Sequence, residues 1–197
     1  MCCMTDVTLW YTTRAAGIVS LVMLSGVVTL GLLAHMRVEG HRWPRFLTQA
    51  LHRNLALLAV AFLALHIVTA VVDPYTHLGL VAATVPFGSW YRTFWLGLGT
   101  IAFELIIAMT ATSLLRTRLS VRLWRVIHWT AYLAWPLAVV HGLGTGADAF
   151  SLWSLMITIA CVLVVGAAAT SRWLTQPPNS IQSMRRRARQ ADMATTR

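Results

Sequence analysis

The sequence contains no lysine and few charged residues of any kind. Charged residues make up 11% of its 197 positions, whereas ordinary soluble domains have about 25%. Hydrophobic residues account for 57% of the chain. This share excludes a disordered protein, because disordered segments are poor in apolar residues. A single, unusually apolar domain is therefore expected.

Cysteine is also scarce. Cys2, Cys3 and Cys161 are too few and too badly spaced for a disulfide framework or a zinc site. The glycine-rich fingerprint that binds dinucleotides is missing as well. We therefore expect that the chain does not take hydride from a nicotinamide cofactor by itself.

All sixteen basic residues are arginines, and the net charge is +10. The arginines cluster between long apolar runs, which is typical of a membrane protein and not of one that binds nucleic acid. The runs 17–34, 51–72, 94–115, 124–143 and 152–173 are each close to the ~20 residues that cross a bilayer. The sequence therefore predicts an all-α membrane protein, a bundle of five transmembrane helices.

The arginines also predict the orientation. Only Arg14 and Arg92 lie on one side of the predicted bundle, and the other fourteen lie on the opposite side. Because cytoplasmic segments are enriched in arginine, we expect the N-terminus outside and the C-terminus in the cytoplasm of a bacterial inner membrane. The expected organisation is an external segment 1–16, a membrane domain 17–173 and a disordered Arg-rich tail 174–197 that contacts anionic lipid.

Four of the seven histidines fall within two apolar runs. Single membrane histidines usually form hydrogen bonds between helices, but intramembrane ionisable residues also mark functional sites. His52 and His66 share one run, and His128 and His141 share another. Since these two runs are parallel in the predicted topology, His52 is level with His128, and His66 with His141. Opposed imidazoles can hold a haem by its iron, so we expect these four histidines to be the metal ligands of two haems.

The remaining histidines, His35, His41 and His77, are interpreted as surface residues. The spacing within the second ligand pair needs a separate explanation. At about 100° per residue, thirteen residues do not return to the same helix face, so His128 and His141 diverge. Pro136 lies between them, and a kink at this proline would help to redirect one end of the helix.

Several other residues have two interpretations. Glu104 is expected to be a protonated or hydrogen-bonded carboxyl inside the bundle, with a haem-edge or proton-handling role as the alternative. Phe62 and Trp135 lie between the two histidine levels, either as packing or as an aromatic path for electrons. Arg53 and Arg125 lie near the inner histidines, where they pair with haem propionates or contact lipid phosphate.

Glycines on the first and third runs indicate close approach of other groups. They leave room for a neighbouring helix or a macrocycle, and they are Gly17, Gly26, Gly31, Gly97 and Gly99. The connection between the second and third runs contains an apolar stretch, 78–87, that is expected to lie in the membrane interface or to cap the bundle.

The histidine spacing resembles that of the ferric reductase-like transmembrane domain family. This family includes ferric reductases, NADPH oxidases and the haem-binding membrane subunit of the bacterial methionine sulfoxide reductase system. The resemblance rests on H-x13-H at His52 and His66 and on H-x12-H at His128 and His141. It extends over about residues 11–173.

The stretch from Trp124 through His128 to Tyr132 is also similar to the family pattern. The resemblance implies two b-type haems and electron flow from the cytoplasm outward. It further implies that Arg14 lies near the outer haem.

The expected function is transmembrane electron transfer from a cytoplasmic-side donor to an extracytoplasmic acceptor, as the electron-transfer subunit of an oxidoreductase. Many family members carry a flavin and nicotinamide domain after the membrane part, but only 24 residues follow the fifth run here. The expected donor is therefore a cytoplasmic flavoprotein, which brings its own flavin, or quinol. The alternatives are a quinone-linked cytochrome b anchor of a respiratory enzyme and a non-redox membrane scaffold.

Overall fold

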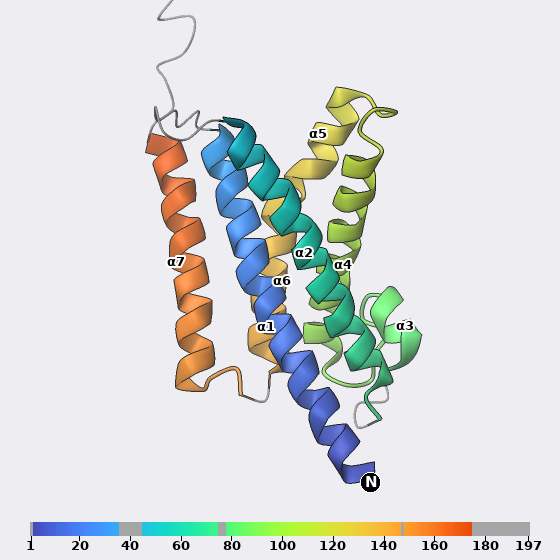
Figure 1. The fold of residues 1–197 in the computed structure, drawn as a ribbon. Helices are drawn as coiled ribbons and strands as arrows, with labels where there is room; N and C mark the ends of the chain where they lie inside the picture. Colours follow the sequence, from blue (N-terminus) through green and yellow to red (C-terminus); the bar gives the residue numbers. More distant parts are fainter. Residues whose placement is uncertain (1, 36–44, 75–77, 147, 175–197) are drawn as a thin grey trace, which may run out of the picture.

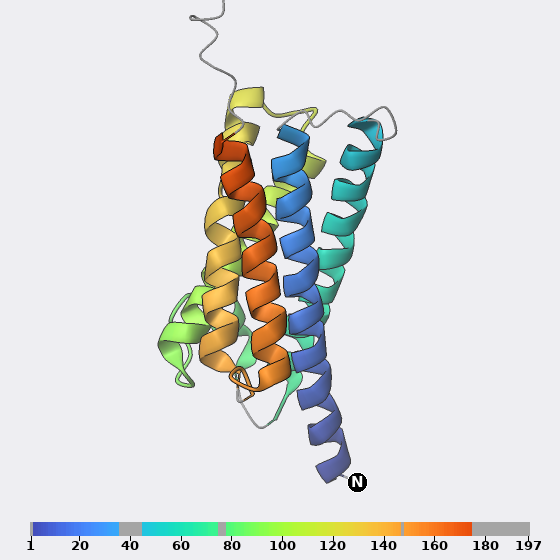
Figure 2. The same ribbon diagram turned by 90° about the vertical axis from the view of Figure 1, so that its left-hand side faces the viewer.

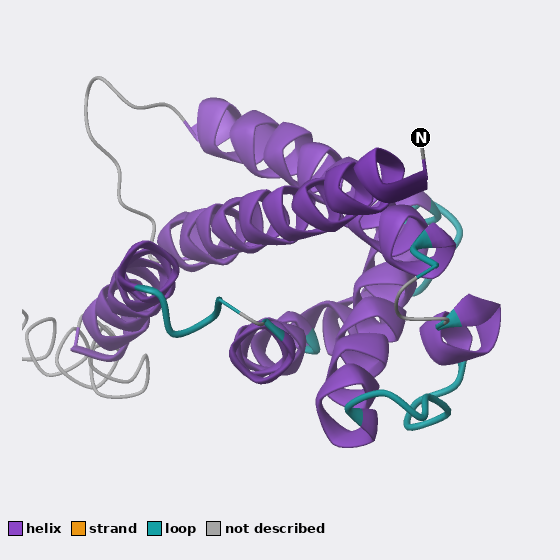
Figure 3. Ribbon diagram, turned by 90° about the horizontal axis from the view of Figure 1, so that it is seen from below, coloured by secondary structure: helices purple, strands orange, loops and turns teal. Residues whose placement is uncertain are grey.

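The computed structural model describes residues 2–35, 45–74, 78–146 and 148–174. Within these residues every regular element is a helix (Figures 1 and 3). The helices are α1 (Cys2–His35), α2 (Arg45–Val72), α3 (Gly79–Thr84), α4 (Thr93–Leu114), α5 (Val121–Trp129), α6 (Ala131–Thr145) and α7 (Leu152–Leu174). Five spans are long and apolar enough to cross a bilayer. The prediction of an all-helical protein with five membrane-spanning segments is confirmed.

The surface of the bundle is strongly apolar. Leu163 on α7 is 66% exposed and Val68 on α2 is 59% exposed. Exposed apolar surface of this extent is unfavourable in water and is stable in the hydrocarbon core of a membrane.

Helix α1 is longer at its N-terminal end than predicted. It begins at Cys2, and its apolar span begins at Val7 and not at Gly17. Residues 7–16 contain one charged side chain, Arg14, and its guanidinium pairs with Asp148. The helix can therefore continue without an unpaired charge, and the predicted boundary after residue 16 falls inside it.

The helices pack in a fixed order. Antiparallel helices α1 and α2 make the most extensive contacts, α4 packs against α6, and α7 lies against α1 (Figures 1 and 2). The side chain of Cys161 is buried on α7, in agreement with the packing role expected from its apolar run.

The fourth span is divided between α5 and α6 at Thr130. The backbone N–H of Thr130 donates to the carbonyl of Ile127 at 3.0 Å, and its Oγ1 donates to the same carbonyl at 2.6 Å. The last turn of α5 is therefore tightened, and the helix axis changes direction at this point (Figure 1). Pro136 lies within α6, so the redirection occurs closer to His128 than the proline predicts.

Helix α3 lies at the side of the bundle, next to α4 and α2 (Figures 1 and 3). The hydroxyl of Thr100 on α4 donates to the carbonyl of Ala82 on α3 at 2.9 Å. Phe87, which has a φ of 63°, places its ring where a Cβ atom at Gly97 would collide with it. The stretch 78–87 therefore packs against α4, while Leu80 and Val81 are 73% and 60% exposed.

Candidate functional site

The four membrane histidines form two facing pairs. The ring centroids of His66 and His141 are 6.3 Å apart, and those of His52 and His128 are 6.1 Å apart. We call the first the outer pair and the second the inner pair, after the predicted orientation. The structure thus brings together the rings that the sequence pairs by depth, with α2 opposite α6 in one case and α5 in the other.

The separation within each pair suits two ligands of one metal ion. A ring nitrogen lies about 1.1 Å from its centroid and binds a metal at about 2.0–2.1 Å, so opposite imidazole ligands have centroids about 6.2 Å apart. The described residues contain no group of three or more His, Cys, Asp or Glu side chains that could hold an ion. Two imidazoles alone suit an iron whose remaining positions are filled by a macrocycle.

Three of the four rings are fixed by a backbone hydrogen bond from Nδ1. The bonds join His66 to the carbonyl of Thr13 at 2.8 Å, His52 to that of Val27 at 3.0 Å and His141 to that of Trp95 at 2.9 Å. A carbonyl oxygen has two lone pairs, so it can accept this bond in addition to a helical one. With Nδ1 as the donor, Nε2 is left free to bind a metal.

Each of these carbonyls is followed, four residues later, by a glycine. The glycines are Gly17, Gly31 and Gly99. Because Cα–Cβ bonds in a helix tilt toward its N-terminus, a side chain at these positions would cover the carbonyl. A Cβ atom at Gly17 would lie 2.9 Å from Nδ1 of His66, and one at Gly99 would collide with the ring of His141. We call each such carbonyl, with its glycine, a carbonyl–glycine seat.

The two seats on α1 repeat at the spacing of the histidines that they hold. Gly17 and Gly31 are fourteen residues apart, as are His52 and His66 on the antiparallel helix α2. From the sequence, these glycines indicate only that another group approaches the helix closely. The sequence does not identify the backbone carbonyls as hydrogen-bond acceptors for the histidines. The shared fourteen-residue period is the signal that could have identified them.

His128 is held in another way. Its Nδ1 is buried and has no hydrogen-bond partner among the described residues. The ring of Trp124 stacks on it, with centroids 5.0 Å apart and planes at 24°. The guanidinium of Arg116 lies 4.7 Å from the centroid of the Trp124 ring. Aromatic stacking thus replaces the backbone bond at this ligand position.

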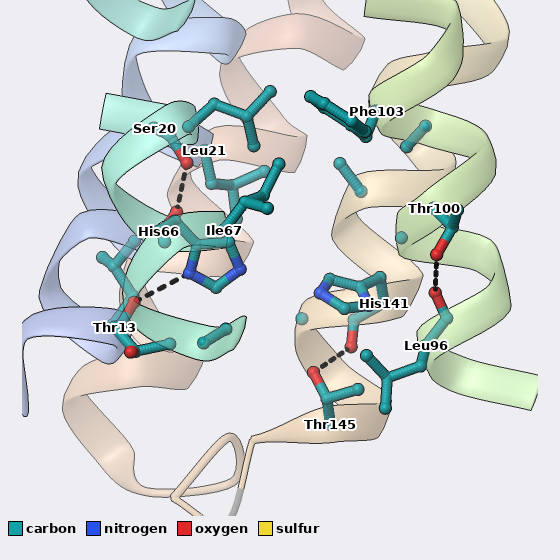
Figure 4. Close-up of a pocket in the computed structure, with 18 of the residues that line it drawn as sticks. Thr13, Ser20, Leu21, His66, Ile67, Leu96, Thr100, Phe103, His141 and Thr145 are labelled. Atoms are coloured by element: carbon teal, nitrogen blue, oxygen red, sulfur yellow. Dashed lines mark hydrogen bonds between the residues drawn. The ribbon is translucent and has the colours of Figure 1, made fainter. Parts of the chain in front are cut away.

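A cavity surrounds the outer pair (Figure 4). It is partly open, and its lining comes from α1, α2, α3, α4, α6 and α7. The rings of His66 and His141 point toward one another across it, with apolar side chains such as Leu21, Ile67 and Phe103 nearby. This mostly apolar lining suits a mostly apolar ligand.

Arg14 lines the same cavity. Its guanidinium pairs with Asp148, and a Cβ atom at Gly146 would lie 2.6 Å from its Nη1. Its Nε is buried and has no hydrogen-bond partner among the described residues. A buried N–H without an acceptor, at the edge of a cavity, suits an anionic group of a ligand.

Arg92 connects the two helices that carry the third seat. It is the residue before α4, in a left-handed conformation with φ 41°, and its Nη1 donates to the carbonyl of Gly144 near the end of α6. This contact lies three residues before Trp95, whose carbonyl holds His141. The start of α4 and the end of α6 are thereby tied together beside the outer pair.

The other predicted residues occupy varied positions. Arg53 and Arg125 are exposed, a placement compatible with both of their interpretations. Phe62 and Trp135 are half-buried, and Nε1 of Trp135 donates to Oγ of Ser25 on α1 at 2.9 Å. His35, His41 and His77 lie outside the residues whose side chains are described.

The expectation that Glu104 lies inside the bundle is wrong. Its side chain is exposed. Ala102 and Ile106 are buried, and each is two residues from Glu104, about 200° around a helix. The carboxyl therefore lies on the face of α4 that is directed away from the bundle.

Comparison with known proteins identifies the family of this chain. Residues 16–139 match the family described as the ferric reductase like transmembrane component. The chain belongs to this ferric reductase-like family. The match includes His52, His66 and His128, and it ends two residues before His141. Membership implies transmembrane electron transfer, and members of the family typically bind haem. Comparisons with curated proteins and with solved structures gave no match.

Proposed function

We propose that this protein carries electrons across a bacterial inner membrane through two b-type haems, one held by each histidine pair. Electrons would pass from a cytoplasmic-side donor to an extracytoplasmic acceptor. The observation that carries the proposal is the presence of two facing pairs with centroid separations of 6.1 and 6.3 Å. Each separation leaves room for one iron between two ring nitrogens.

The outer haem would be held by Nε2 of His66 and His141, and the inner haem by Nε2 of His52 and His128. The iron of a bound haem supplies reversible one-electron chemistry. Because His66 and His141 would both hold the outer haem, an acceptor would receive its electron without displacing either ring. The carbonyl–glycine seats keep their rings in one tautomer and one orientation.

Arg14 is the proposed partner of an outer haem propionate. Its unpartnered Nε and its place in the cavity lining support this role. Arg53 and Arg125 are the candidates for the inner propionates, with lipid phosphate as the alternative partner.

The two levels together reach across most of the membrane. Fourteen residues separate His52 from His66 on α2, which corresponds to about 21 Å at 1.5 Å per residue. A hydrocarbon core is about 30 Å thick. Trp135 lies between the two levels in the sequence and is bonded to Ser25 on α1, and its ring is the proposed aromatic step between the haems.

The donor is proposed to bind at the end of the bundle formed by α5 and the connection before it. Exposed arginines gather there, and they are Arg116, Arg118, Arg122 and Arg125. Such a surface attracts an acidic flavoprotein and raises its association rate. Quinol that arrives through the membrane is the alternative donor.

The test is haem quantitation on the purified full-length protein. A pyridine haemochrome assay should give two haems per chain in the wild type and about one after replacement of His52, His66, His128 or His141 by alanine. His35→Ala, which removes a histidine outside both pairs, is the matched control and should keep two. Full haem content in all four pair variants would exclude the assigned ligands.

A further inference from the structure

The inner pair is asymmetric in a way that the outer pair is not. Both outer rings, and His52 of the inner pair, donate to a backbone carbonyl. His128 has a buried Nδ1 without a partner in the described part of the chain. One of the four ring positions therefore lacks the contact that fixes the orientation and raises the basicity of an imidazole ligand.

The sequence of α4 explains why a fourth seat is missing. On α1 the seats repeat after fourteen residues, and the same step along α4 from Trp95 and Gly99 leads to Met109 and Ser113. The carbonyl of Met109 accepts a hydrogen bond from Oγ1 of Thr112 at 3.1 Å. Ser113 has a side chain where the seat would need a glycine.

Ser113 has a different partner. Its Oγ accepts a hydrogen bond from Nε1 of Trp124 at 3.4 Å, and the ring of Trp124 stacks on His128. The guanidinium of Arg116 lies over the Trp124 ring. Helix α4 therefore acts on His128 through an indole and not through a carbonyl.

We propose that Trp124 is the positioning residue of His128, and that the inner iron can exchange this histidine for a small neutral ligand such as carbon monoxide. The inference rests on the proposed function. In the exchange, the bond from Nε2 of His128 to the iron breaks and an iron–carbon bond to carbon monoxide forms. The iron stays ferrous, and the freed imidazole stays neutral. His52, His66 and His141 keep their iron bonds because their rings are anchored at Nδ1.

The experiment is a carbon monoxide titration of the full-length protein, reduced with dithionite in lipid nanodiscs and followed by its absorption spectrum. Wild type should bind carbon monoxide at one of its two haems. The double variant His66→Ala, His141→Ala, which keeps only the inner haem, should retain that binding. Binding confined to the outer haem, or no binding at either, would overturn the proposal.

Variants of Trp124 test the positioning role. Trp124→Leu removes the stacked ring and should tighten carbon monoxide binding about tenfold, the scale of losing an outer-shell ligand contact. Trp124→Phe keeps a stacked ring and should stay near the wild-type affinity. Trp129→Leu is the matched control, because Trp129 lies on the same helix and is 61% exposed. Equal affinities in the Trp124→Leu and Trp129→Leu variants would refute the role of Trp124.

Haem content distinguishes a failure of the proposed function from a failure of the positioning role of Trp124. A wild-type protein without haem would refute the proposed function. Two haems per chain, with a carbon monoxide affinity that ignores Trp124, would refute only the further inference. If Trp124→Leu loses the inner haem, the Trp124→Phe variant decides, since full haem content there supports positioning by stacking and its loss contradicts it.

Discussion

The α1–α2 side of the bundle and the α4–α5–α6 side hold the same two histidine levels in different ways. On the first side both helices are continuous, and two carbonyl–glycine seats on α1 match two histidines on α2 at one fourteen-residue period. On the second side the span is broken at Thr130, and a single seat on α4 serves His141. Each pair therefore joins one ring held by the first side to one ring held by the second, at centroid separations of 6.1 and 6.3 Å.

The difference follows from helix periodicity. A fourteen-residue step ends about 40° short of whole turns, whereas a thirteen-residue step ends about 140° short. Continuous helices can keep His52 and His66 on one face, but His128 and His141 require a change of axis between them. The break at Thr130 supplies this change and leaves His128 on the short helix α5, where it relies on Trp124.

Which histidine pair is the inner one depends on the orientation of the protein in the membrane. Labelling of introduced cysteines should show this orientation as an all-or-none difference in reactivity. In a background with Cys2→Ser and Cys3→Ser, we expect Phe150→Cys, between α6 and α7, to react with a membrane-impermeant maleimide in intact cells. Thr117→Cys, between α4 and α5, should react only after permeabilisation, because arginine-rich connections stay in the cytoplasm. Both introduced positions are exposed, so access through the membrane is the variable that differs. The reverse pattern would exchange the two levels and the direction of electron flow.

Filling a seat should disturb one level and spare the other. Gly99→Ala places a methyl group against the ring of His141, and overpacking of this kind costs about 1–3 kcal/mol. We expect loss of the outer haem with retention of the inner one, measured as haem per chain. Gly31→Ala, where the contact with His52 is a looser 3.4 Å, should have a smaller effect on the inner haem.

Gly166→Ala is the control for these glycine variants. A Cβ atom there meets nothing within 4 Å, so the Gly166→Ala variant should keep both haems. Its free energy of unfolding should rise by up to about 1 kcal/mol, because alanine has a higher helix propensity than glycine. Equal haem loss from Gly99→Ala and Gly166→Ala would show that the seats do not hold the rings.

Arg14 belongs to the outer level only, so its removal should sharpen the contrast between levels. Arg14→Gln breaks the ion pair with Asp148. The side chain of Arg14 is 20% exposed and that of Asp148 is 25% exposed. For a partly exposed pair we expect a stability loss of about 1 kcal/mol, together with a lower midpoint potential for the outer haem, since a cation near a haem favours the reduced state. Asp148→Asn breaks the same ion pair but keeps the cation, so its outer potential should not fall. A redox titration that finds both potentials unchanged in Arg14→Gln would place Arg14 away from the haem.

The smallest expected effect concerns the tie between the two sides of the bundle. Ser25→Ala removes the acceptor of the Trp135 indole N–H, and hydrogen bonds between membrane helices contribute about 0.6 kcal/mol on average. We expect a loss of this size in the free energy of unfolding, with both haems kept. Ser20→Ala, which removes a bond to the carbonyl of Gly17 within α1 itself, is the matched control and should cost less.

Several features could be predicted from the sequence because they depend on local composition and period. Apolar length alone predicts five spans, and the positions of His52, His66, His128 and His141 along them predict which rings meet. The irregular thirteen-residue step also predicts a change of helix direction. These quantities are properties of one helix at a time, and the structure agrees with them.

Other features depend on neighbours and could not be predicted. Every residue has a carbonyl, so no side-chain pattern identifies those of Thr13, Val27 and Trp95 as acceptors. The outward placement of Glu104 depends on which face of α4 meets α6, and the break at Thr130 replaces the kink expected at Pro136 because a tightened turn redirects the helix there. The sequence by itself determined the spans and the two histidine levels, through hydrophobic length and helical rise. Only the tertiary structure decided how each ring is held, because that depends on the backbone and side chains that a neighbouring helix presents.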